Sequence, residues 1–122
     1  MSYYLFLDDE RKPSNVTWIP MPNVLWTIVR NYDQFVSMIE ERGIPEFISF
    51  DHDLADEHYV AYLEGRSDYG PEKTGYDCAK WLVDHCLEKE APIPNYQVHS
   101  LNHIGRENIN SYLENAKKHL GL

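Results

Sequence analysis

The sequence predicts a small α/β domain, with a mostly parallel four-stranded β-sheet and helices on both faces, over residues 1–122. Four short segments rich in aromatic and β-branched residues alternate with segments whose apolar residues recur at helical spacing. This alternation favours parallel pairing, because a helical crossover returns the chain to the same end of the sheet. Polar side chains follow three of the four strand-like segments. Since ligands bind beyond the carboxyl ends of parallel strands, the sequence predicts a site along that edge.

Strands and helices are expected where the local pattern changes period. Strands are predicted at residues 3–7, 24–30, 46–50 and 96–100. The first helix is predicted after an Asn31 N-cap, ending at Gly43, and the second after a Thr74 N-cap, running through residue 88. A final helix is predicted from about residue 105, because apolar residues recur three and four positions apart there.

Two connecting segments show no clean helical period. Residues 8–23 contain three prolines and predict an extended loop lying over one end of the sheet. Residues 54–73 are polar and contain Gly65, Gly70 and Pro71. They predict a long loop, which is either a lid beside the site or a surface excursion.

Charge and hydropathy restrict the partners. The net charge is −9, which argues against extended nucleic acid, because such ligands bind cationic surfaces. A small phosphate-bearing ligand stays compatible, since a divalent metal can reverse the local charge. No apolar run reaches the roughly 20 residues of a membrane span, and the N-terminus has no signal-peptide pattern. A cytoplasmic protein without membrane contact is therefore expected.

Carboxylates follow two of the predicted strands. Asp8 and Asp9 come after the first, and Asp51 comes after the third. Brought to one edge, they would repel each other unless a cation joined them, and hard oxygen ligands suit Mg²⁺ or Mn²⁺. The alternative is structural: Asp8 and Asp9 cap a turn, and Asp51 pairs with Arg11.

Two histidines lie at neighbouring strand ends. His52 and His99 can act as base and acid in phosphoester chemistry, because imidazole titrates near neutrality. Asp53 is a candidate to orient His52. In the alternative interpretation, each histidine is a surface residue or a hydrogen-bonded structural one.

Candidate phosphate ligands lie near two helix starts. Ser100 and Asn102 precede the final helix, and Thr74 begins the second one; helix N-termini favour anions. Arg11 and Arg106 are candidate phosphate clamps. Simple N-capping explains Thr74 and Asn102 equally well.

Taken together, these motifs resemble those of the cyclic-phosphate-processing receiver domains, from residue 3 to about residue 115. The resemblance is carried by Leu7-Asp8-Asp9-Glu10-Arg11, Ser49-Phe50-Asp51-His52-Asp53-Leu54, Thr74-Gly75-Tyr76-Asp77 and Val98-His99-Ser100-Leu101-Asn102. It implies a receiver-like (flavodoxin-like) three-layer fold and action on cyclic phosphates of nucleotide or ADP-ribose type. It also implies a site lined by Asp8, Asp9, Asp51, His52, Asp53, His99, Ser100 and Asn102.

The chain also resembles an ordinary signalling receiver in outline, with two differences. No strand followed by a phosphoryl-contacting Lys is predicted after residue 105, and no full helix is predicted between the first two strands. The leading hypothesis is therefore a phosphoesterase that opens a small cyclic phosphate, either with a divalent metal or with the two histidines as a metal-free pair. The rivals are a phospho-acceptor module using Asp51 and a non-catalytic module that sequesters a cyclic nucleotide.

Overall fold

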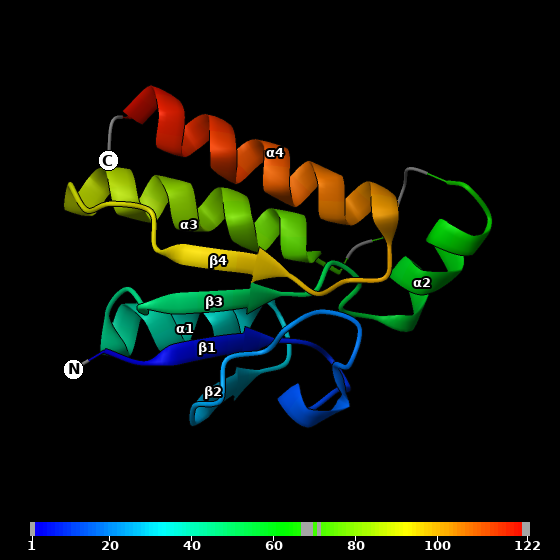
Figure 1. Cartoon of the computed structure of the whole chain (residues 1–122). Helices are drawn as coiled ribbons and strands as arrows, with labels where there is room; N and C mark the ends of the chain where they lie inside the picture. Colours follow the sequence, from blue (N-terminus) through cyan, green and yellow to red (C-terminus); the bar gives the residue numbers. More distant parts are fainter. Residues whose placement is uncertain (1, 67–69, 71, 121–122) are drawn as a thin grey trace.

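Four parallel strands form the centre of the structure, a computed structural model that describes residues 2–66, 70 and 72–120 (Figure 1). The strands are β1 (Tyr4–Leu7), β2 (Trp26–Val29), β3 (Phe47–Phe50) and β4 (Asn95–Val98), in the order β2-β1-β3-β4. Leu7 lies opposite both Val29 and Phe50, and Phe50 lies opposite Val98. All four strands therefore end level with one another, and the segments that follow them meet along one edge.

The helices begin where the sequence provides caps. α1 (Tyr32–Arg42) starts at Asn31, whose side chain accepts a hydrogen bond from the backbone N of Gln34. α3 (Gly75–Lys89) starts at Thr74, which forms a reciprocal capping box with Asp77. Both predicted N-caps are confirmed.

The main core lies between one face of the sheet and three helices. Alternate strand residues such as Leu5 and Phe50 are fully buried against α1, α3 and α4 (His103–Leu120). Phe35 of α1 packs against Phe50, and Tyr96 of β4 donates to Glu114 of α4. These helices thus share a single core on one side, and α1 is seen behind the sheet in Figure 1.

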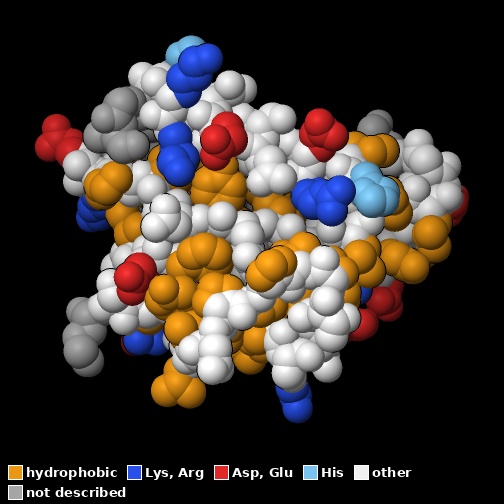
Figure 2. Space-filling view, viewed as in Figure 1, with side chains coloured by type: hydrophobic (Ala, Val, Ile, Leu, Met, Phe, Trp, Pro, Cys, Tyr) orange, Lys and Arg blue, Asp and Glu red, His pale blue; other side chains and the backbone are white. Residues whose placement is uncertain are grey.

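The opposite face is covered by the connection between β1 and β2. It contains one short 3₁₀ turn, η1 (Pro13–Asn15), and its Trp18 side chain donates to the carbonyl of His99. Beneath it, Phe6 and Trp26 pack edge-on. Figure 2 shows hydrophobic side chains gathered over this region of the molecule.

The predicted α/β class with parallel strands is confirmed, but the helices are not divided between both faces as expected. The connection over residues 8–23 supplies no α-helix for the second face, because its three prolines interrupt helical hydrogen bonding. An extended segment occupies that place instead. Among the described residues, no helix has the length and apolar character needed to cross a membrane.

Several element boundaries differ from the sequence prediction. Residues predicted as a long loop contain α2 (Asp56–Leu63), which has acidic residues in its first turn and no glycine or proline within it. The rest of that predicted loop falls partly on 67–69 and 71, outside the described residues. β4 ends at Val98 and α4 begins at His103, so the segment between them is a tight polar connection.

Candidate active site

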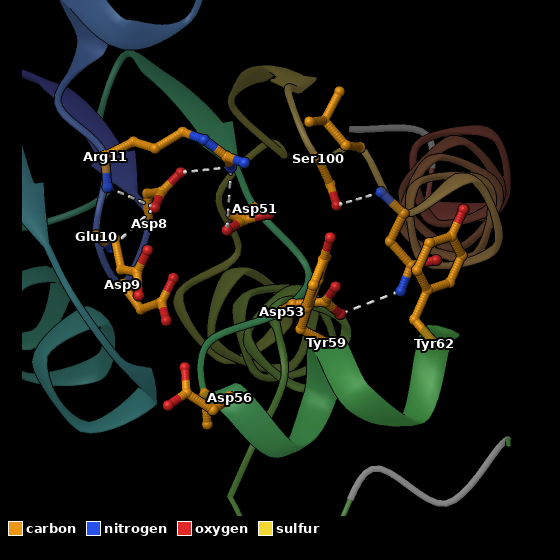
Figure 3. A pocket seen from close by; sticks show the side chains of 13 residues that line it. Asp8, Asp9, Glu10, Arg11, Asp51, Asp53, Asp56, Tyr59, Tyr62 and Ser100 are labelled. Atoms are coloured by element: carbon orange, nitrogen blue, oxygen red, sulfur yellow. Dashed lines mark hydrogen bonds and ion pairs between the residues drawn. The ribbon is translucent and has the colours of Figure 1, made fainter. Parts of the chain in front are cut away.

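A pocket of about 310 Å³ lies at the carboxyl edge of the sheet, between the strand ends and α2 (Figure 3). Its lining comes from the segments after β1, β3 and β4 and from α2. The lining residues are Asp8, Asp9, Glu10, Arg11, Asp51, Asp53, Ala55, Asp56, Tyr59, Tyr62, Ser100, Leu101 and Asn102. This lining carries six carboxylates and one cationic side chain, so an anionic ligand needs additional positive charge there.

Asp8 is held as an anion by a full set of donors. One carboxylate oxygen accepts the backbone N–H groups of Glu10 (3.0 Å) and Arg11 (2.8 Å), and the other lies 3.0 Å from Nε2 of His99. Burial on its own would raise the pKa of Asp8, but the hydrogen bonds from His99 and the two amides lower it to about 2. The carboxylate is therefore charged and fixed in orientation.

The negative charges of Asp51 and Asp9 are less well stabilised than that of Asp8. Asp51 is buried, and burial followed by the charge of Asp8 raises the pKa of Asp51 to about 8. Burial and the neighbouring charges of Asp8 and Glu10 raise the pKa of Asp9 to about 6. Arg11 offsets part of this repulsion, with Nη1 at 3.4 Å from Asp8 and 3.9 Å from Asp51. Its guanidinium also lies over the Trp18 ring, 5.1 Å from the centroid.

These carboxylates fit a divalent cation. One carboxylate oxygen each of Asp8 and Asp51 and one ring nitrogen of His99 all lie within 4.8 Å of one another. Two buried, mutually repelling oxygen donors suit a hard cation such as Mg²⁺ or Mn²⁺, which would relieve the repulsion. Asp9 lines the same pocket but is outside this close group among the described residues.

His99 lies behind Asp8, not in the pocket lining. Its ring is fully buried and stacked on Phe6, with centroids 4.6 Å apart. Nδ1 is 2.7 Å from the hydroxyl of Ser49, which itself accepts from Gln97. The hydroxyl therefore donates to Nδ1, which leaves the proton on Nε2 to be donated to Asp8. Burial lowers the pKa of His99, against the opposing effect of Asp8, so the ring is a neutral donor.

His52 is also buried and lies behind a carboxylate. Its Nδ1 is 2.7 Å from Oδ1 of Asp53, which also accepts the amide of Asn102 at 3.0 Å. Although burial opposes it, these two hydrogen bonds lower the pKa of Asp53. The first turn of α4 packs directly on the ring, because a Cβ at Gly105 would lie 2.2 Å from Cγ of His52.

Asn102 joins the helix to the site. Its side-chain oxygen accepts from the backbone N of Gly105 at 2.9 Å, while its amide group donates to Asp53. The backbone N of Asn102 donates to the Ser100 hydroxyl at 3.1 Å. The N-capping role predicted as an alternative for Asn102 thus occurs together with a place in the pocket.

Most of the residues singled out from the sequence come together at this pocket. Seven of them are in the lining: Asp8, Asp9, Arg11, Asp51, Asp53, Ser100 and Asn102. His52 and His99 lie directly behind Asp53 and Asp8. Thr74 is a buried cap of α3, and Arg106 lies 3.1 Å from Nδ1 of His103; neither is in the lining. A phosphate-binding role for these last two stays a prediction.

Sequence reasoning did not single out the α2 side chains of the pocket. Asp56, Tyr59 and Tyr62 recur three positions apart, so they share one helical face, and all three line the pocket. The stretch from residue 55 to residue 64 contains neither glycine nor proline, which was the available signal for a helix. The glycines and the proline further along led to the prediction of a loop throughout.

Comparison with known families supplies one match. The family described as the cyclic-phosphate processing receiver domain matches residues 3–115. No curated protein and no solved structure matches the chain.

Proposed function

Since the chain belongs to the cyclic-phosphate processing receiver family, we propose that it is a hydrolase that opens the cyclic phosphate of a small nucleotide-like or ADP-ribose-type molecule. One observation carries the proposal: paired buried carboxylates, an arginine and neutral donors lie in one pocket at the ends of three parallel strands. Such a pocket suits a phosphate that arrives with a divalent cation.

In this proposal Asp8 and Asp51 hold Mg²⁺ or Mn²⁺, with Asp9 beside them. When bound, the metal supplies positive charge to the phosphate and lowers the pKa of a water molecule. Arg11 adds a second positive charge on the same side of the pocket. The Ser100 hydroxyl accepts from the Asn102 backbone, so its own proton is available to donate to a phosphate oxygen.

The reaction forms one bond and breaks one. The oxygen of water bonds to phosphorus as the water gives up one proton, one ester P–O bond of the ring breaks, and the departing oxygen takes up one proton, to give a phosphomonoester and a hydroxyl. We assign the proton transfer to Asp53, which lines the pocket, with His52 hydrogen-bonded behind it. His99 donates its Nε2 proton to Asp8 in a hydrogen bond that holds this carboxylate in place.

The burial of both imidazoles favours the metal-assisted version over a metal-free histidine pair. Neither ring is in the lining, and His99 has both nitrogens engaged by Ser49 and Asp8. In the metal-free version the two rings would have to meet the substrate directly. We therefore propose that the histidines act through the carboxylates they contact.

The decisive test is a screen of 2′,3′-cyclic nucleotides, ADP-ribose cyclic phosphate and cyclic dinucleotides with Mg²⁺ or Mn²⁺, with products identified by mass spectrometry. We expect ring opening, incorporation of ¹⁸O from labelled water, and loss of turnover with chelator. Asp51→Asn should abolish turnover, whereas Asp84→Asn, at an exposed acid on α3, should not change it.

Two other outcomes would contradict the proposal. Tight binding without any product would indicate a sequestering module. A stable aspartyl-phosphate at Asp51 after treatment with a small phosphodonor would indicate a phospho-acceptor. The sheet makes the second outcome unexpected, because β4 is followed by α4 and the described residues contain no fifth strand to position a lysine.

A further inference from the structure

The two ends of the pocket differ in chemistry. The end at β1 and β3 contains Asp8, Asp51 and Arg11, while the end at α2 contains two tyrosine rings. We propose that Tyr59 and Tyr62 bind the planar base of a nucleotide, so that the substrate is a base-bearing cyclic nucleotide and not a free sugar cyclic phosphate. This inference rests on the proposed function and specifies its substrate.

The two rings extend from one face of α2. Tyr59 and Tyr62 are three positions apart, and Figure 3 shows both side chains extending from α2 toward the segment that carries Ser100. The helix is anchored beneath them by buried His58, whose Nδ1 accepts from the backbone of Leu54 at 2.9 Å and whose Nε2 contacts the carbonyl of Glu72 at 2.7 Å. The helical turn that carries Tyr59 is therefore anchored beside the pocket.

Among the described residues, apolar side chains at this end of the pocket are partly exposed. Tyr59 is 56% exposed and Leu101, across the pocket, is 50% exposed. Aromatic side chains beside a polar anion site are the usual partners of nucleic acid bases, because every base offers a flat face for stacking. An aliphatic ligand would cover the same surface, but it would gain no stacking.

Charge determines which part of the ligand lies at this end. Asp56 lies on the same helix as the tyrosines, and a carboxylate repels a phosphate while accepting hydrogen bonds from amino and hydroxyl groups. The phosphate therefore belongs next to Arg11, where cationic charge is available. The uncharged base and sugar, which carry donors, belong next to the tyrosines.

The pocket has room for about one nucleotide. Its volume of about 310 Å³ is at the lower end of the range for small-molecule sites. One base and one sugar phosphate suit such a space. The inference thus concerns a mononucleotide whose base lies along α2.

Equilibrium binding tests the inference without requiring turnover. The two probes are adenosine 2′-monophosphate and a methyl riboside 2-monophosphate, which replaces the base by a methoxy group, each titrated calorimetrically with Mg²⁺. We expect the base-bearing probe to bind about tenfold more tightly, as one stacked base contributes.

Variants of the α2 tyrosines test whether these side chains cause the difference in affinity between the two probes. Tyr59→Leu with Tyr62→Leu should remove the tenfold advantage and leave the affinity of the base-free probe unchanged, whereas Tyr59→Phe should retain it. Leu63→Ala is the matched control, because Leu63 is an exposed apolar residue of α2 outside the pocket lining. Thermal unfolding of each variant confirms that the fold is intact.

The results separate this inference from the proposed function. Equal affinities for the two probes in the wild type, an advantage that persists in the double variant, or binding of neither probe would overturn it. Turnover of a base-free cyclic phosphate together with equal affinities would leave the hydrolase intact and refute the base site. Discrimination between the probes without any turnover would support the base site and refute the hydrolase.

Discussion

Two histidine–aspartate pairs lie at the same edge of the sheet, yet they are built differently. In the first pair the carboxylate of Asp8 is 1% exposed and accepts from two backbone amides as well as from His99. In the second pair the side chain of Asp53 is 14% exposed, and one of its oxygens accepts hydrogen bonds from both His52 and Asn102. Among the described residues, donors thus constrain both oxygens of Asp8 but only one oxygen of Asp53.

This difference assigns the pairs to different tasks. A carboxylate whose donors fix both oxygens has a low pKa and a fixed direction, which suits holding a cation. A carboxylate with an oxygen open to the pocket can exchange a proton with a ligand. The predictions below are ordered by the size of the effect expected from disturbing this division.

The largest effect is expected from Asp8→Asn. The change removes the charge that holds the cation and leaves His99 without an anionic acceptor, so kcat/KM should fall on the order of 1000-fold. Steady-state rates at increasing Mg²⁺ check this. Asp84→Asn should match the wild type; activity in Asp8→Asn restored fully by ordinary Mg²⁺ concentrations would remove Asp8 from the metal site.

Asp53→Asn should lower kcat about 100-fold while leaving KM nearly unchanged, because a lost proton-transfer group affects the transition state and not ground-state binding. The pH dependence of kcat should also lose the limb due to this group. A variant that instead raises KM with kcat intact would show that Asp53 only binds substrate.

His99→Gln should reduce kcat/KM about tenfold, as expected when a residue that orients a metal ligand is lost. It should also weaken Mg²⁺ binding by a similar factor without changing the shape of the pH profile. The pH profile of this variant should be compared with that of Asp53→Asn, which is expected to lose a limb. Loss of a pH limb in His99→Gln would mean that His99 itself transfers a proton.

Gly105→Ala tests the contact between α4 and the second pair. A Cβ there would lie 2.2 Å from the His52 ring, so the ring or the helix must shift, at a cost of about 1–3 kcal/mol. Urea unfolding measures the loss of stability, and kcat should fall with it. Ser111→Ala, at an exposed position of the same helix, is the control; unchanged stability in Gly105→Ala would contradict the packing described here.

The smallest effect is expected outside the pocket, at Asp77 in the capping box of α3. Burial opposes ionisation, but hydrogen bonds from Thr74 and the charge of Lys80 lower the pKa of Asp77. A lowered folded-state pKa stabilises the protein above the unfolded pKa, and this stabilisation is lost as the pH falls through the folded pKa. Asp77→Asn should therefore cost about 0.5–1 kcal/mol near pH 7 in urea unfolding. The difference from wild type should shrink below about pH 4; a difference independent of pH would exclude the charge as its cause.

The convergence of the polar strand ends could be predicted because it follows from parallel pairing alone. Once Leu7 and Phe50 end neighbouring parallel strands, Asp8 and Asp51 must emerge side by side. The side of the sheet on which His99 lies could also be predicted. His99 is two residues after Gln97, which lies opposite Ser49, so all three side chains point to the face away from the helices. The period of two in a strand carries that information.

Other features depend on contacts between distant segments and could not be predicted in this way. The burial of His52 is produced by Gly105, more than fifty residues away, and no local pattern encodes it. The single helical layer arises because an extended connection covers the second face, held there by side chains such as Trp18. The two tyrosines of α2 can be recognised as pocket residues only once the fold places them beside the strand ends.

The contact between Arg11 and the Trp18 ring gives the protein an optical reporter of its own. The indole NH is bound to the carbonyl of His99, while the ring supports the one guanidinium of the pocket. A ligand that draws Arg11 toward its phosphate must change the environment of that ring. The part of the emission that Trp18 contributes, beside that of Trp26 and Trp81, would then follow occupancy in real time, without any attached dye.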